Sequence, residues 1–236
     1  MSTTSASGRK RTNMMVANKY KFLQTMTTIS LLINTAADDD QEANGICFGG
    51  KPSAPEGALE WPTCASCDGH MQFLGQIPVE TQQGKTSLLL LFMCQNDPGL
   101  CDEWDADAGG NAVIVVPAKS IGSVAPPEEG ETIRPVRYSA AVVEIEGGSY
   151  DEARENWAAS AGVNFRNVLG QIGGVPAWLQ GEEVPFCDSC KAPMSFVAQL
   201  EEGPDHETSM NFGGGGCAYV YHCRCDKDNA KMLWQS

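Results

Sequence analysis

Cysteine pairs of the form CxxC occur twice in this sequence of 236 residues, each at the head of a similar stretch. "CASCDGHMQFLGQ" begins at Cys64 and "CDSCKAPMSFVAQ" begins at Cys187, and six of the thirteen aligned positions are identical. A CxxC turn places two thiolates on one side of a tight loop, which is the spacing of half of a tetrahedral metal site. The sequence therefore predicts two metal-binding turns in two related segments.

Further cysteines that could complete each site stand at or just after the end of an apolar stretch, "SLLLLFMC" in the first segment and "AYVYHC" in the second. A β-hairpin returns its second strand to the start of its first, so each later pair is expected beside its own CxxC turn. We predict two structural zinc ions, each held by four thiolates. The ligands are Cys64, Cys67, Cys94 and Cys101 in the first site, and Cys187, Cys190, Cys223 and Cys225 in the second.

Alternatives to this assignment remain open at the level of the sequence. Cys47 and Cys217 are left over and are expected to be buried thiols, although Cys217 or His222 could replace a ligand in the second site. Iron-sulfur clusters also use four cysteines, so the sequence leaves the metal's identity undecided. Disulfides and a thioredoxin-like redox pair are less favoured, because no clear secretory signal is present and each CxxC precedes a strand instead of opening a helix.

No arrangement of residues predicts catalysis. A catalytic zinc keeps an open coordination position, whereas four thiolates fill the shell and make the metal a poor Lewis acid. The three histidines, His70, His206 and His222, form no HExxH motif and have no nucleophile beside them. We therefore expect neither a catalytic residue nor an organic cofactor, and we expect the protein not to be an enzyme.

The elements expected to position the cysteines are two hairpins. Strands are predicted over 71–79 and 87–94 in the first unit and over 194–200 and 218–223 in the second. "NAVIVVP" and "YSAAVVEIE" predict two further strands. "YDEARENWAAS" predicts a short helix, with Ser149 and Glu152 as its capping box.

The N-terminal part is predicted to be a disordered tail over 1–16 followed by a helix over 17–43. Its apolar run, "FLQTMTTISLLINTAA", is too short and too polar for a membrane span, and we expect a cytoplasmic protein. The predicted fold class is α+β, mainly β: two pseudo-repeated, zinc-clipped β-hairpin units fused in one body, with an N-terminal helix. The first repeat would span 44–146, and a short helix with the second repeat would span 147–236.

The charge of the chain restricts its partners. The formal net charge is −14 and the sequence pI is about 4.5, which argues against binding the phosphate backbone of nucleic acid. An acidic surface favours a basic protein partner. Three acidic stretches, "TAADDDQEA", "CDEWDAD" and "QLEEGPDHE", are the expected contact surfaces if they are more than solvated loops.

A family resemblance can be stated from these motifs. "GGVPAWLQ", a CxxC followed by an apolar strand ending in Gln, and an aromatic strand running into cysteine together resemble the YwqG-like family, a bacterial domain family of unknown function. The chain is also similar to the N-terminal repeats of the programmed cell death protein 2 family. "WPTCASCDGHMQFLGQI" and "WDADAGGNAVIVVP" match the first copy, and the resemblance runs from about Gly45 to the C-terminus. Many YwqG-like proteins have fewer cysteines, so the metal ligands rest on the spacing in this sequence.

The resemblance implies a binding role. YwqG-like domains recur beside bacterial toxins as immunity proteins, and relatives of programmed cell death protein 2 act as chaperones for a basic ribosomal protein. We expect an immunity protein, or antitoxin, that neutralises a cognate basic toxin such as a nuclease. A chaperone-like binder of an endogenous basic protein is the alternative, and an enzyme of unrecognised type is the second alternative.

Overall fold

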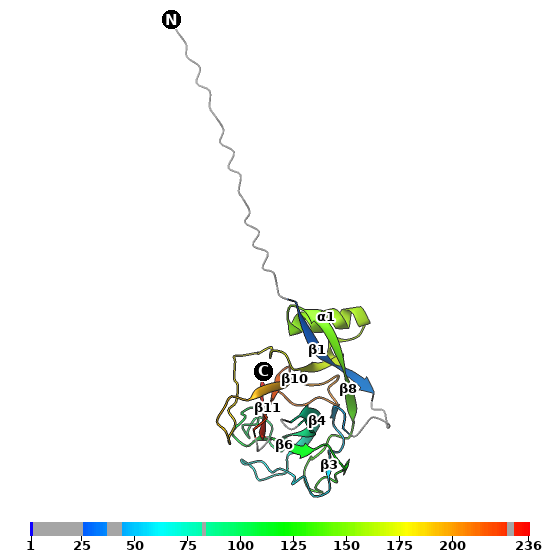
Figure 1. Cartoon of the computed structure of the whole chain (residues 1–236), viewed down its shortest axis with the longest axis vertical. Helices are drawn as coiled ribbons and strands as arrows, with labels where there is room; N and C mark the ends of the chain where they lie inside the picture. The colour runs from blue at the N-terminus through cyan, green and yellow to red at the C-terminus, as the bar shows by residue number, and fades with distance from the viewer. Residues whose placement is uncertain (2–25, 37–43, 82–83, 226–228) are drawn as a thin grey trace.

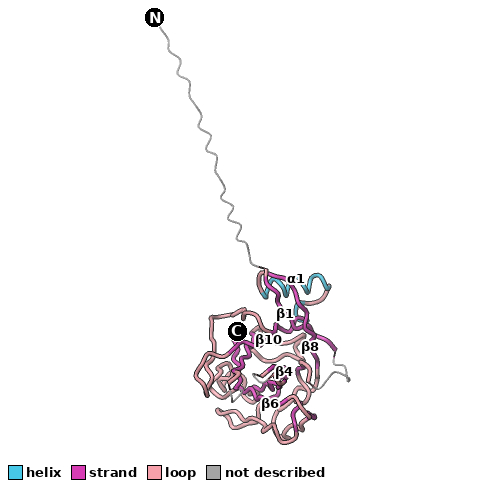
Figure 2. Tube along the Cα trace, viewed as in Figure 1, coloured by secondary structure: helices cyan, strands magenta, loops and turns pink. Residues whose placement is uncertain are grey.

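The computed structural model describes residues 1, 26–36, 44–81, 84–225 and 229–236. Strands far outnumber helices among these residues, and long loops wrap around the strands (Figures 1 and 2). The elements are β1 (Thr27–Ala36), β2 (Cys47–Phe48), β3 (Ser53–Pro55), β4 (Gln72–Glu80), β5 (Thr86–Met93), β6 (Asn111–Pro117), β7 (Ile121–Ser123), β8 (Tyr138–Gly147), α1 (Tyr150–Ala161), the 3₁₀ helix η1 (Phe165–Asn167), β9 (Val168–Ile172), β10 (Ser195–Glu201), β11 (Cys217–Cys223) and β12 (Asn229–Gln235).

Ten of these strands close a barrel in the order β1-β8-β2-β4-β5-β6-β12-β11-β10-β9, and β3 and β7 form a separate two-stranded sheet. One arc of the barrel, β8-β2-β4-β5-β6, comes from residues 44–147. The other arc, β9 to β12 together with β1, comes from residues 168–236 and the N-terminal strand. The arcs join at two places. Ten residue pairs connect β1 with β8, but a single pair, Val113 and Ala230, connects β6 with β12.

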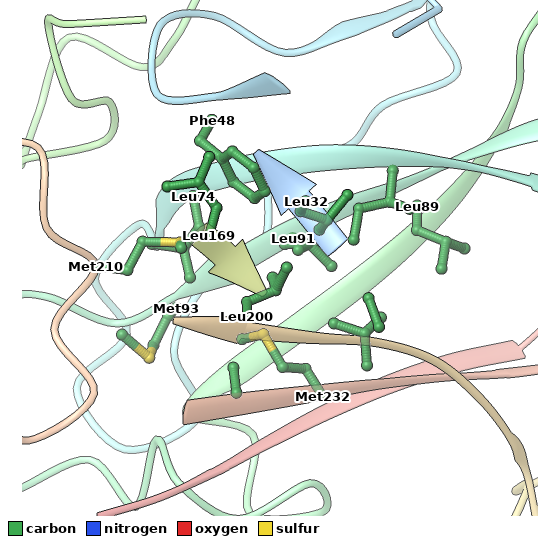
Figure 3. Packing of buried hydrophobic residues seen from close by; sticks show 14 of the residues in the cluster. Leu32, Phe48, Leu74, Leu89, Leu91, Met93, Leu169, Leu200, Met210 and Met232 are labelled. Atoms are coloured by element: carbon green, nitrogen blue, oxygen red, sulfur yellow. The ribbon is translucent and has the colours of Figure 1, made fainter. Parts of the chain in front are cut away.

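The barrel interior holds the largest apolar cluster. Side chains of successive strand residues point to opposite faces, so every second residue of β5 (Leu89, Leu91 and Met93) points inward. Figure 3 shows these residues meeting Leu32 of β1 and side chains from the opposite arc. The intervening residues of β5 are also buried, because loops cover the outer face there. A strand buried on both faces reads as the continuous apolar run "SLLLLFM".

Three smaller apolar clusters lie on the outside of the barrel. One contains the first four predicted ligands, together with Met71 and Phe92. A second contains Cys187, Cys223 and the tyrosines of β11. The third lies where α1 crosses β1 and β8 (Figure 1), and it contains Tyr150 and Ala153. The barrel thus serves as a frame for two cysteine clusters and one helix.

The predicted helix is confirmed, and so is the half of the capping box in which Ser149 is the N-cap. The Ser149 hydroxyl accepts a hydrogen bond from the Glu152 N–H at 3.2 Å, and the helix ends at Gly162, which has a φ of 67°. The Glu152 carboxylate, however, accepts from the N–H of Gly148, the residue before the N-cap, at 3.2 Å. Among the described residues, no helix is long and apolar enough to cross a membrane.

The N-terminal helix predicted over 17–43 is wrong where the structure describes it, because residues 27–36 form strand β1. Thr27, Thr28, Ile29, Ile33 and Thr35 are all β-branched, a composition that favours strands. Residues 17–25 and 37–43 lie outside the described residues, as do residues 2–16 of the predicted tail. The only α-helix among the described residues is α1.

The mainly β character and the predicted strands are confirmed, with β4, β5, β10 and β11 at the two predicted hairpins and β6 and β8 between them. Strand β12 was not expected, although it completes the second arc. The division of the chain into two repeats with boundaries at 44, 146 and 236 stays a prediction.

Candidate metal centres

In the first cysteine cluster, two backbone hydrogen bonds close the CxxC turn. Cys64 N–H donates to Gly69 O at 2.9 Å, and Asp68 N–H donates back to Cys64 O at 2.9 Å. Asp68 closes this turn in the left-handed region, with a φ of 58°. Cys94 follows the last residue of β5, and its N–H donates to Gly110 O at 2.8 Å.

The second cluster uses the same local bonds. Cys187 N–H donates to Ala192 O at 2.9 Å, and Lys191 N–H donates to Cys187 O at 2.9 Å. Lys191 has a φ of 60°. Cys223 is the last residue of β11, so the returning strand again delivers a thiol to the turn.

All eight predicted ligands fall into two groups of four. Within each group the sulfur atoms lie within 4.8 Å of one another. The groups are Cys64, Cys67, Cys94 and Cys101 in the first centre, and Cys187, Cys190, Cys223 and Cys225 in the second.

The sulfur spacing fits a tetrahedral metal. Four thiolates about 2.3 Å from a zinc ion stand roughly 3.8 Å from each other. The Sγ atoms of Cys67 and Cys94 are 3.7 Å apart, and those of Cys190 and Cys223 are 3.5 Å apart. All ten cysteines are free thiols, and these separations are well beyond the about 2.05 Å of a disulfide. The residues present therefore fit zinc or another ion that prefers four thiolates.

An asparagine side chain donates to the sulfurs of each centre. Asn96 Nδ2 lies 3.5 Å from both Cys67 Sγ and Cys94 Sγ. Asn229 Nδ2 lies 3.3 Å from Cys187 Sγ. Hydrogen bonds of this kind orient ligands and disperse the negative charge that four thiolates would place on a metal.

The thiols of each centre are in contrasting environments. Burial raises the pKa of Cys101, and it raises the pKa of Cys223 to about 12. Hydrogen bonds from the backbone of the turn lower the pKa of Cys67, and they lower that of Cys187 to about 6. A cation bound at either centre would favour the thiolate form of all four cysteines, including those whose burial opposes ionisation.

The two cysteines outside these groups, and the histidine considered as a substitute ligand, lie elsewhere. Cys47 of β2 is buried and accepts a hydrogen bond from Arg137 Nη2 at 3.4 Å. Cys217 lies at the opposite end of β11 from Cys223, facing Glu201 of β10. His222 directly precedes Cys223 on the strand, so its side chain points to the opposite face. Neither Cys217 nor His222 belongs to the second group.

The acidic stretch at 101–107 has internal roles as well as exposed carboxylates. Glu103 is buried, and its carboxylate accepts hydrogen bonds from the N–H groups of Gly99 and Cys101. Asn111 Nδ2 donates to Glu103 O at 2.9 Å. These bonds shape the loop that carries the fourth ligand of the first centre, so Glu103 is not available to a partner.

The acidic stretch at 199–207 is also partly committed to internal contacts. Glu201 forms an ion pair with Arg154 at 3.0 Å and accepts a hydrogen bond from Tyr150 Oη at 2.8 Å. Asp205 accepts from the backbone N–H groups of Glu207 and Thr208. In the third acidic stretch, residues 37–43 lie outside the described residues.

A buried lysine contacts one aspartate beside each of the two centres. Lys231 of β12 contacts Asp107, in the loop after Cys101, and its Nζ lies 2.8 Å from Asp188 Oδ1, inside the second CxxC turn. The Lys231 side chain is 8% exposed. Sequence reasoning missed Lys231 and Asn229, because their partners are about forty or more residues distant and no local motif marks them.

Comparison with known proteins adds no assignment. No protein-family model matches the chain, and no curated protein matches it. The resemblance to the YwqG-like and programmed cell death protein 2 families therefore stays a prediction from the motifs.

Proposed function

We propose that this chain is a non-enzymatic, zinc-braced, acidic module that binds a basic protein. The observation that carries the proposal is the closure of both cysteine groups: each supplies four sulfur ligands within 4.8 Å, which is the full shell of a tetrahedral ion. A substrate would find no open position on such a metal. The metals would then hold the loops in place, and the function would lie on the protein surface.

The metal part of the proposal predicts two zinc ions per chain. Native mass spectrometry should give a mass that exceeds the denatured mass by two zinc ions, and X-ray absorption should show four sulfur neighbours at about 2.3 Å. Nitrogen or oxygen in the shell would instead indicate an open site. Visible charge-transfer absorption together with bound iron would indicate iron-sulfur clusters.

The partner part of the proposal rests on the net charge of −14. Opposite potentials steer two proteins together and raise the rate of association, and salt weakens this effect. A nuclease toxin is basic around its nucleic-acid groove, so an acidic protein that covers the groove would neutralise it. We infer an immunity role on these grounds and from the motif resemblance. The ten free cysteines suit the reducing cytoplasm.

The immunity role is tested with the product of a neighbouring toxin-like gene. The zinc-loaded chain should bind that product, protect cells that express it, and associate more slowly at high salt. Absence of both binding and protection would reject the immunity role. Recovery of an endogenous basic protein, such as a ribosomal protein, as the stable partner would instead identify a chaperone.

A further inference from the structure

The segment that leads into the first CxxC turn contains a short strand, β3. Gly49 N–H donates to Leu74 O at 2.9 Å, and Ser53 N–H donates to the Gln76 side chain at 3.2 Å. These two bonds fix the loop on β4. The strand that begins at Ser53, β3, then pairs with β7 on its other edge.

The loop that leads into the second CxxC turn has equivalent anchors. Gly173 N–H donates to Val197 O at 2.7 Å, and Ala177 N–H donates to the Gln199 side chain at 2.9 Å. The sequences "GGKPSAP" and "GGVPAWL" align without a gap at these anchors. Residues 177–179 therefore occupy the position that β3 occupies in the first loop.

The backbone of β3 shows which groups face the added strand. Val124 N–H donates to Pro52 O at 3.0 Å, and the next hydrogen-bonded position of this antiparallel ladder pairs Ala54 with Gly122. Ala54 therefore directs both its N–H and its C=O to β7. The position aligned with Ala54 in the second loop is Trp178.

The corresponding groups of Trp178 have no such partner. Both of its neighbours bond to Tyr219 of β11: Tyr219 Oη donates to Ala177 O at 2.9 Å and accepts from Leu179 N–H at 3.1 Å. Since polar groups alternate along an extended chain, the N–H and C=O of Trp178 face the opposite side. Among the residues that the structure describes, no strand pairs with 176–179, and no hydrogen bond is made by the N–H or C=O of Trp178.

Exposure distinguishes the two edges. Residues 52–54, which lie beside β7, are buried. The aligned residues 176–178, which have no covering strand, are half-buried, and Leu179 beside them is 49% exposed. The Trp178 ring packs on Tyr219, with centroids 4.4 Å apart, so the second edge is held in place without a covering strand. A preformed edge loses little conformational entropy when a strand is added.

We propose that the edge at 176–179 binds an extended, basic segment of the partner protein as an added antiparallel strand, in the way that β7 binds β3. This proposal rests on the proposed function and names the surface that would perform it.

The charge near the edge indicates which residues the bound segment should contain. Exposed Glu182 and Glu183 follow the edge closely, and the chain carries a net charge of −14, so lysine or arginine should flank the incoming strand. A small residue should lie opposite Trp178, as Gly122 lies opposite Ala54. Backbone bonds supply affinity in this mode of recognition, and side-chain pockets supply selectivity.

The first test uses a peptide with the sequence of residues 119–125, "KSIGSVA", extended by two lysines. The matched control replaces its glycine with N-methylglycine, which removes the N–H that would donate to Trp178 O. In the zinc-loaded, isotope-labelled full chain, the glycine peptide should shift the amide signals of Trp178 and Leu179 and should protect the Trp178 amide from exchange. The N-methylated peptide should bind at least about tenfold more weakly, the equivalent of one lost hydrogen bond. Equal binding of the two peptides, or binding at another surface, would overturn the proposal.

The second test uses two substitutions at equally exposed apolar residues. Val175→Lys places a positive charge beside the edge and should weaken the peptide about tenfold, whereas Leu100→Lys, also at a side chain 78% exposed, should not change binding. Equal effects of the two substitutions would reject this edge. A wild-type dimer that Val175→Lys abolishes would show that the edge binds a second copy of the chain, and would likewise overturn the proposal.

The outcome for the edge can be separated from the outcome for the proposed function. A basic partner that binds wild type and Val175→Lys equally well contradicts the edge and leaves partner binding intact. A chain that binds the glycine peptide at Trp178 but no basic protein contradicts the proposed function alone.

Discussion

At the residue scale, the cysteines differ in what their loss would do. Cys64 lies in the first group of four, whereas Cys47 is buried but does not belong to either group. Cys64→Ser should reduce bound zinc from two ions to one, because an incomplete thiolate set binds the metal poorly. The loss of a structural metal also removes folding free energy, so the melting temperature should fall by on the order of 10 °C.

Cys47→Ser is the control for this substitution. It changes a buried thiol in the same way but should retain two zinc ions per chain, measured by elemental analysis. If Cys64→Ser keeps both ions and melts like Cys47→Ser, the first centre is not a metal site.

The ligand residues were predictable from the sequence for a local reason. The CxxC spacing marks half of each group, and the apolar strands that return to Cys94 and Cys223 supply the rest. Asn229 and Lys231 could not be predicted, because their contacts depend on how β12 passes the second turn. Local spacing therefore identifies ligands, and tertiary structure determines the groups that surround them.

At the element scale, strands with a strong local pattern were predictable and strands defined by their neighbours were not. Strand β5 is apolar from Leu88 to Met93 and β11 runs directly into Cys223, so both were expected. Strand β1 was mistaken for a helix because its apolar residues were weighed without their β-branching. Strand β12, "NAKMLWQ", has no such pattern and is a strand because it pairs with β11 along its whole length.

The loop over 101–110 depends on a glycine close to the first CxxC turn. Gly109 has a φ of 79° and accepts a hydrogen bond at its oxygen from Ala65 N–H at 3.0 Å. A Cβ at this glycine would lie only 2.7 Å from Ala65 Cβ. Gly109→Ala should therefore displace the turn, weaken zinc binding at the first centre, and cost about 1 to 3 kcal/mol in unfolding free energy.

Gly162→Ala separates steric contact from backbone strain. Gly162, which follows α1, has a φ of 67°, but a Cβ there would meet nothing within 4 Å. Both variants should lose stability to the left-handed backbone, and Gly109→Ala alone should lose zinc affinity in a chelator competition. Identical zinc affinities in the two variants would show that the turn tolerates displacement.

At the scale of the whole molecule, the two arcs of the barrel are joined unequally. Strands β1 and β8 pair over ten residues, whereas β6 and β12 share one pair. The loop over 101–110 reinforces the weaker junction, since Trp234 N–H donates to Trp104 O at 3.1 Å and the two indole rings pack edge to face. The loop that carries Cys101 therefore rests on the strand that carries Asn229, a donor to the second centre.

Lys231 makes the most direct connection between the centres, and its removal tests whether they act together. Lys231→Met keeps the length of the side chain but ends the contacts with Asp107 and Asp188, which are 66% and 73% exposed and can be hydrated by water. The variant should therefore fold and lose only about 1 to 3 kcal/mol of stability.

Zinc release to a chelator should change from one phase to two, because loss of metal at one centre would no longer loosen the loop at the other. Lys119→Met, at an exposed lysine, is the control and should release zinc as wild type does. A single phase in Lys231→Met, at the wild-type rate, would mean that the two centres are independent or are coupled through Trp104 and Trp234 instead.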